Sequence, residues 1–118
     1  MSYAKDKLQR IGELEKNWNG FGAEPYSEML IKYVSDLIDT LPVEPDIYPL
    51  ANIGIQLDIP IDATRMIEIE VCNDFRIMCS LFDDTKVIQI KDSVGMKDVN
   101  NIVGIWMSVK EPSEYPRL

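Results

Sequence analysis

The chain has 118 residues, a hydrophobic content of 46% and a net charge of −8, which fits one ordinary globular domain with a core. Histidine is absent, which excludes Ser-His and Cys-His catalysis and histidine-ligated zinc sites. No apolar run is long enough to cross a bilayer, and the charged N-terminus lacks the apolar stretch of a secretory signal, so we expect no membrane association and a cytoplasmic location.

Two amphipathic helices are predicted in the first third of the chain. In residues 2–17, apolar side chains recur every three or four positions, which indicates a helix that ends in the following Asn- and Gly-rich stretch. The same period returns in residues 27–41, where Ser27 is a good N-cap and Pro42 ends the helix. The segment 42–49 contains three prolines, which cannot donate to a β-ladder, so we expect a connector or an edge strand there.

From residue 52 the apolar period changes to two, which predicts four half-buried strands in an antiparallel meander. The alternating segments are residues 53–59, 66–71, 75–81 and 87–91. The turns are placed by keeping apolar side chains on one face of the sheet. A three-residue loop then puts Val71 opposite Phe75. A two-residue turn at 84–85 puts Leu81 opposite Ile88.

A third helix is predicted near the C-terminus, with Asp98 as its cap. Its apolar face consists of Val99, Ile102, Val103 and Trp106. The predicted order is therefore two N-terminal helices, a four-stranded antiparallel meander and a C-terminal helix, with the helices on one face of the sheet. This is an α+β fold. Residues 1–110 form the single domain, and residues 111–118 form an irregular tail.

The excess of negative charge lies in the middle of the chain. Residues 24–74 carry eleven acidic and two basic side chains, a net charge of −9. Direct binding to nucleic acid requires clustered lysines and arginines and is not expected. A basic protein is the expected partner, and a simple contribution to solubility is the alternative.

Three acidic side chains in this segment are predicted to lie on the outward face of two neighbouring strands. Asp58 belongs to one strand, and Glu68 and Glu70 belong to the next. Pairing the strands with their isoleucines inside puts Asp58 opposite Glu68, or opposite Glu70 after a shift of two residues. Like charges in these positions repel, unless the face is well hydrated or a positive group binds there.

Three interpretations of this face are open. In the first, it is a solvated surface, partly compensated by Arg65, Arg76 and Lys91. In the second, it docks on a basic protein. The residues in contact would be Gln56, Asp58, Met66, Glu68, Glu70 and Met78. In the third, it binds Mg²⁺, as in metal-dependent nucleases, although Val71-Cys72 stands where those enzymes normally have a lysine. Because the same face carries apolar side chains, a homodimer is a further alternative.

The stretch between the two N-terminal helices contains Trp18, Asn19, Gly20, Phe21 and Gly22. We expect it to have a structural role, because aromatic side chains at a helix–helix corner usually pack on the core. The spacing Gly20-x-Gly22 lacks the remainder of any phosphate-binding motif.

Three short motifs resemble a family of small bacterial and prophage proteins. Residues 17–25 resemble the signature NWDGYGAxP, residues 54–58 resemble GIQLEW, and residues 67–70 resemble LEIEI. The resemblance covers roughly residues 14–71, with Asn19 in place of the usual Asp and Asp58-Ile59 in place of Glu-Trp. It implies a helix–helix–meander fold and an association with mobile elements, and it supplies no activity.

We therefore expect a non-enzymatic, acidic protein-binding module that uses no cofactor and no metal. On a phage or mobile element it would act as an inhibitor, such as an anti-CRISPR-like or other anti-defence protein. It would dock on a basic, nucleic-acid-binding partner such as a nuclease, partly by imitating nucleic-acid charge. Two alternatives remain: a small metal-dependent nuclease or hydrolase that uses Asp58, Glu68 and Glu70, and an antitoxin or immunity-like partner protein.

Overall fold

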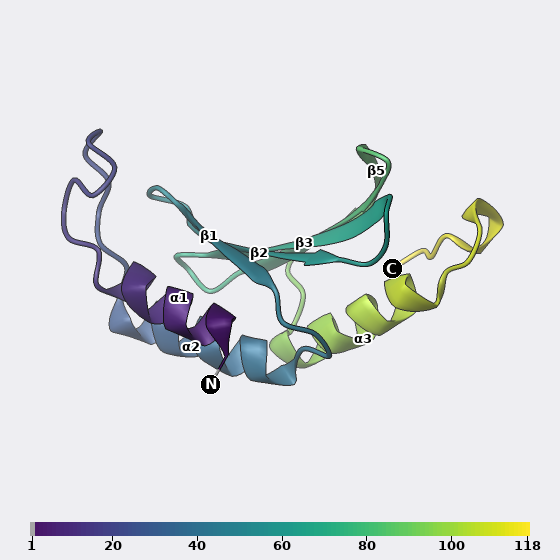
Figure 1. Ribbon diagram of the computed structural model, residues 1–118, viewed down its shortest axis with the longest axis horizontal. Coiled ribbons are helices and arrows are strands. Elements are labelled where there is room, and N and C mark those ends of the chain that lie inside the picture. Colours follow the sequence, from purple (N-terminus) through teal and green to yellow (C-terminus); the bar gives the residue numbers. More distant parts are fainter. Residues whose placement is uncertain (1) are drawn as a thin grey trace.

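The computed structural model describes residues 2–118 and contains three helices on one face of a five-stranded antiparallel sheet (Figure 1). The helices are α1 (Tyr3–Gly12), α2 (Glu28–Thr40) and α3 (Met96–Ser108), followed by a short 3-10 turn (Pro112–Glu114). The strands are β1 (Asp46–Leu50), β2 (Gly54–Pro60), β3 (Arg65–Cys72), β4 (Ile77–Asp83) and β5 (Lys86–Lys91). They pair in chain order. The predicted α+β class and meander are confirmed, whereas the predicted number of four strands is wrong.

The additional strand is β1, in the proline-rich segment predicted as a connector or an edge strand. Its pairing with β2 runs from Asp46 opposite Asp58 to Leu50 opposite Gly54. Pro49 has no N–H to donate, and the sheet tolerates it because β1 lies at the edge and has one neighbour. The edge-strand alternative is therefore the correct one.

A serine caps the N-terminus of both N-terminal helices. The hydroxyl of Ser2 accepts from the N–H of Lys5 at 3.0 Å, and that of Ser27, the predicted cap, accepts from the N–H of Leu30 at 3.1 Å. α1 ends at Gly12, well before the predicted end near residue 17. Glycine is a poor helix former, and the chain after it forms a loop rather than a further helical turn.

α3 begins earlier than the sequence predicted. Its N-cap is Gly95, and Asp98, the predicted cap, lies in the first turn, where its charge favours the positive end of the helix dipole. The predicted apolar face is confirmed, because Val99, Ile102, Val103 and Trp106 are all buried. The indole Nε1 of Trp106 donates to the backbone oxygen of Met66 at 3.2 Å, which fastens α3 to β3.

The pairing of β3 with β4 differs from the prediction by two residues. Val71 lies opposite Ile77 rather than opposite Phe75. Phe75 adopts φ 71° in the turn, and the N–H of Cys72 donates to the oxygen of Arg76 at 2.8 Å. A shift of two residues keeps every side chain on its face, so the apolar pattern could not distinguish the two registers.

The pairing of β4 with β5 contains a bulge. The predicted two-residue turn is confirmed, and Asp84 and Thr85 adopt φ 48° and 69°, as in the type I′ turns that favour hairpins. Leu81, however, lies opposite Gln89, because Ile88 is an extra residue without a partner on β4. Beyond the bulge, Ile90 turns outward and is 53% exposed.

The core lies between the helices and the inner face of the sheet, where the isoleucines and leucines of β2, β3 and β4 are buried. The C-terminal tail packs on the helix side: the ring of Tyr115 lies 5.4 Å from that of Trp106, and the N–H of Leu118 donates to Gln89 Oε1 at 3.1 Å. No helix within residues 2–118 is long and apolar enough to cross a membrane. No helix of this part covers the other face of the sheet (Figure 1).

Candidate functional site

The outer face of the sheet, which is the face turned away from the helices, carries all the residues predicted to contact a partner. These are Gln56, Asp58, Met66, Glu68, Glu70 and Met78. Asp58 lies opposite Glu68, and Gln56 lies opposite Glu70, which is the first of the two registers considered for this strand pair. β4 adds Met78 opposite Glu70. The structure therefore brings the predicted set together on three adjacent strands.

A fourth carboxylate, which the sequence reasoning missed, extends this cluster. Asp46 of β1 lies opposite Asp58, so Asp46, Asp58 and Glu68 form a row across three strands. The signal was the alternation of Asp46, Ile47 and Tyr48, which places Asp46 outward once the segment is a strand. We define the acidic patch as Asp46, Asp58, Glu68 and Glu70.

The acidic patch lacks ion pairs. Within residues 2–118, no lysine or arginine lies within ion-pair distance of its carboxylates. Arg65 instead contacts Asp62, with Nε–Oδ2 at 2.9 Å. Arg76 contacts Asp92, with Nη1–Oδ2 at 3.2 Å. Lys91 lies opposite Cys79, on the inner-face register. None of these three cations therefore forms an ion pair with the acidic patch. Arg76 still lies near Glu70, because Cys72 Sγ is 3.6 Å from Arg76 Nη2 and 3.9 Å from Glu70 Oε2.

Burial and mutual repulsion act on two members of the patch. The pKa of Asp58 is raised, chiefly by burial and further by the charge of Asp46, although the amide of Gln56 opposes this by donating to Oδ1 at 2.9 Å. The pKa of Glu68 is raised by burial and by the charges of Asp58 and Glu70. Keeping these groups ionised therefore costs free energy, which a nearby cation would recover.

An apolar strip crosses the outer face beside the acidic patch. It consists of Pro60, Met66, Phe82 and Val87, which follow one another in register from β2 to β5. Val87 is 52% exposed, and Met66 and Phe82 are partly exposed. Apolar side chains next to charged ones are the usual composition of a protein interface.

The loop between α1 and α2 has a divided role. Trp18 is half-buried and lies 6.1 Å from the ring of Tyr26, as predicted for packing on the core. Phe21 is 90% exposed and takes no part in the core. Gly20 and Gly22 adopt φ 78° and 83°, a conformation that glycine tolerates best.

Acidic and cysteine side chains were also considered in the sequence as ligands of a metal or as thiols. Within residues 2–118, no three His, Cys, Asp or Glu side chains are arranged to hold a metal ion. Cys72 and Cys79 are both free and buried, and they lie on opposite faces of the sheet. Burial raises the pKa of the Cys79 thiol to about 12, so this thiol is a poor nucleophile at neutral pH.

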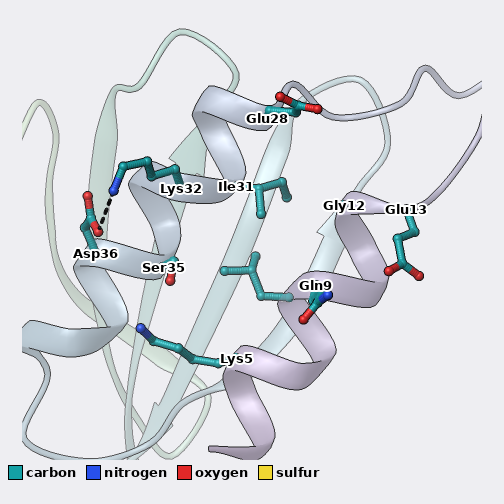
Figure 2. Close-up of a pocket in the computed structure, with 10 residues that line it drawn as sticks. Lys5, Gln9, Gly12, Glu13, Glu28, Ile31, Lys32, Ser35 and Asp36 are labelled. Atoms are coloured by element: carbon teal, nitrogen blue, oxygen red, sulfur yellow. Dashed lines mark ion pairs between the residues drawn. The ribbon is translucent and has the colours of Figure 1, made fainter.

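A groove of about 520 Å³ lies between α1 and α2, on the side of the helices away from the sheet (Figure 2). Its lining includes the apolar side chains of Leu8 and Ile31. Its rim carries Lys5, Glu13, Glu28, Lys32 and Asp36. Lys32 and Asp36 form an ion pair at 3.5 Å. The groove thus mixes both signs of charge, whereas the acidic patch carries one.

The outer face therefore offers four carboxylates on adjacent strands, without ion-paired cations in the described part of the chain, and an apolar strip beside them. Such a surface can bind a basic group and bury apolar area at the same time. Comparisons with protein-family models, with curated proteins and with solved structures find no match. The resemblance of residues 17–25, 54–58 and 67–70 to a bacterial and prophage family therefore stays a prediction.

Proposed function

We propose that this protein is a non-enzymatic binding module whose outer sheet face docks on a basic surface of another protein. The observation that carries the proposal is the acidic patch, with four carboxylates on three adjacent strands and no ion pair among the described residues. Like charges in cross-strand positions destabilise a sheet. A partner that brings lysines or arginines would remove this repulsion on binding.

The apolar strip supports the same proposal. Charge complementarity steers association and sets specificity, whereas burial of apolar area supplies much of the affinity. Met66 belongs to the strip and shares β3 with Glu68 and Glu70, so one partner surface could cover both. The uncovered sheet leaves room for such a surface (Figure 1).

The geometry of the row favours a nucleic-acid-binding partner. Neighbouring strands lie about 4.8 Å apart, so Asp46, Asp58 and Glu68 present charges in a line at short, regular spacing. Proteins that bind nucleic acid recognise lines of negative charge with clustered lysines and arginines. A module with this surface would compete with nucleic acid and inhibit its partner, which is the role we propose on a phage or mobile element.

The test begins with capture of bacterial proteins at low salt on the immobilised chain. A captured protein is then purified, and its affinity is measured for the wild type and for a triple variant with Asp58→Lys, Glu68→Lys and Glu70→Lys. We expect the triple variant to bind at least about tenfold more weakly, because three attractive charges become repulsive. The affinity of the wild type should fall steeply with added salt.

The matched control reverses three exposed carboxylates elsewhere, with Glu13→Lys, Glu15→Lys and Asp36→Lys. Its net charge equals that of the triple variant, so a loss confined to the triple variant assigns the effect to the outer face. Circular dichroism and thermal melting verify that both variants are folded. Binding of the triple variant at wild-type strength would disprove docking through the acidic patch.

A further inference from the structure

The loop of residues 17–25 presents an aromatic ring to solvent on a fixed backbone; we call it the aromatic loop. Phe21 at its tip is 90% exposed. Gly20 and Gly22 flank it with φ 78° and 83°, and a Cβ at either position would meet no atom within 4 Å. The two glycines are therefore required by the turn of the backbone and not by close packing.

Two asparagine side chains hold the backbone around Phe21. Oδ1 of Asn19 accepts from the N–H groups of Phe21 at 2.8 Å and Ala23 at 3.2 Å. Oδ1 of Asn17 accepts from the N–H of Gly22 at 2.7 Å, and the N–H of Asn17 donates to the oxygen of Ala23 at 2.6 Å. Such bonds fix a turn from within, so the conformation of the tip does not depend on Phe21 itself.

The base of the aromatic loop is attached to the sheet. Trp18 donates through Nε1 to the oxygen of Glu24 at 2.9 Å. The hydroxyl of Tyr26 donates to the oxygen of Leu50 at 2.7 Å, and the N–H of Glu24 donates to Oδ1 of Asn52 at 2.9 Å. The loop and the β1–β2 turn therefore form one unit.

This unit stands beside the outer face. In Figure 1 the loop rises past the end of the sheet, on the side away from the helices. The β1–β2 turn contributes a second apolar side chain, Ile53, which is 52% exposed. The aromatic loop and the β1–β2 turn therefore both lie at one end of the sheet, within reach of a partner that covers the outer face.

We infer that Phe21 is an anchor that enters an apolar pocket at the edge of the basic surface proposed to dock on the acidic patch. This inference rests on the proposed function and adds a second contact to it. Isolated exposed apolar residues are common on protein surfaces and usually have no function. Phe21 differs because its backbone is already ordered, so binding would lose little further conformational entropy. Buried aromatic anchors also contribute a large share of the affinity at protein interfaces.

The first experiment tests proximity. A photoreactive benzoylphenylalanine is introduced at position 21 and, as a control, at position 107, where an exposed methionine lies on α3 far from the loop (Figure 1). The probe is the protein that the wild type captures and purifies from bacterial lysate. We expect cross-linking to this protein from position 21 and none from position 107. Absence of cross-linking from position 21 contradicts the inference.

The second experiment separates the anchor from the acidic patch. Phe21→Ala should weaken binding of the same purified protein about tenfold, with the salt dependence of the wild type, because no charge changes. Asn19→Ala keeps the ring and loosens the loop, so we expect an intermediate loss. Met107→Ala should bind like the wild type, and thermal melting should be unchanged for Phe21→Ala because the side chain is exposed.

Each outcome decides between the two claims. If Phe21→Ala binds like the wild type while the triple charge variant does not, the anchor is wrong and the proposed function stands. If the triple charge variant binds like the wild type, the acidic patch is not the docking site, and the shared surface inferred here fails with it. If both variants lose affinity, both claims are supported.

Discussion

Gly54 is a single residue on which the geometry of the functional face depends. It lies opposite Cys72, at the end of the strand pair that carries most of the acidic patch. A Cβ at position 54 would lie 2.0 Å from the backbone oxygen of Val71 and 2.8 Å from Cα of Cys72. Real Cβ atoms do not approach backbone so closely, so β2 and β3 could pair in this way only with glycine here.

Gly54→Ala should therefore lower the free energy of unfolding by about 1–3 kcal/mol, as overpacking does. Urea denaturation measures the change. The control is Gly104→Ala, in the middle of α3, where a Cβ would meet no atom within 4 Å. This control should raise stability by about 0.5–1 kcal/mol, because alanine favours helix. Wild-type stability of Gly54→Ala would contradict the close approach of the two strands.

Individual residues were predictable where a local rule applies to them. Ser27 was predictable as the cap of α2, because a serine hydroxyl directly before an apolar helical pattern accepts a hydrogen bond from a free N–H of the first turn. The exposure of Phe21 was not predictable, because apolar periodicity assigns inside and outside only within helices and strands. Because α1 ends at Gly12, the aromatic loop lies outside any helix or strand, and apolar periodicity does not apply to it.

At the scale of elements, the acidic patch is a source of instability built into β2 and β3. The pKa values of Asp58 and Glu68 are raised, so the folded protein binds protons at these sites more readily than the unfolded chain does. The ionised patch consequently destabilises the fold at neutral pH. This cost is relieved as the pH falls through the raised pKa values, and the relief is complete below the ordinary carboxylate range.

The double variant Asp58→Asn, Glu68→Gln should be more stable than the wild type at pH 7, because it removes two partly buried charges and their mutual repulsion. The removed repulsion alone contributes about 0.2–1 kcal/mol. The advantage should shrink towards pH 4, where the wild-type carboxyl groups take up protons. Thermal or urea unfolding across this range measures the difference. Glu15→Gln, at an exposed site on the loop after α1, should have no effect at either pH. A pH-independent difference would show that ionisation of these two carboxylates does not destabilise the fold.

The elements themselves were largely predictable, and their registers were only partly so. The alternation of apolar residues identified β2 to β5, and the register of β2 with β3 was one of two that the isoleucines allow. The strand β1 was ambiguous because its prolines obscure the alternation. The bulge at Ile88 could not be inferred, because one extra residue in β5 leaves no mark on composition or turn length.

At the scale of the whole molecule, the C-terminal tail connects α3 with the sheet. The ring of Tyr115 packs on Trp106, and its hydroxyl donates to the carboxylate of Asp83. This hydrogen bond is the main cause that lowers the pKa of Asp83 and raises that of Tyr115. The bond therefore stabilises the fold at pH values where Asp83 is ionised and Tyr115 is protonated. It is lost when Asp83 is protonated at low pH or Tyr115 is ionised at high pH.

Tyr115→Phe should lower stability at neutral pH, because it removes the hydroxyl and keeps the ring. The difference from wild type should be constant between about pH 5 and pH 9 and should decrease outside this range. Unfolding curves at a series of pH values test this. Tyr3→Phe is the control, because Tyr3 is exposed and does not belong to the core. A difference that keeps its size throughout the acid range would contradict a contribution from the ionised Asp83 carboxylate.

The overall arrangement, with helices on one face of a meander, followed from amphipathic periods that leave each element one face to bury. The packing of the tail did not follow, because residues 111–118 have no period to read and their contacts depend on Trp106 and Gln89, which lie elsewhere in the chain. The open outer face was predictable, because helices placed on one face of the sheet leave the other face uncovered.

The bulge at Ile88 also bears on how the protein behaves at high concentration. β5 ends the sheet, and a regular exposed ladder at that position would be a template on which further chains could add and grow into fibrils. The extra residue interrupts the ladder, and Lys86 and Lys91 place a positive charge at each end of the strand. A second molecule would have to match an irregular backbone and bring like charges together, so this border of the sheet resists polymerisation.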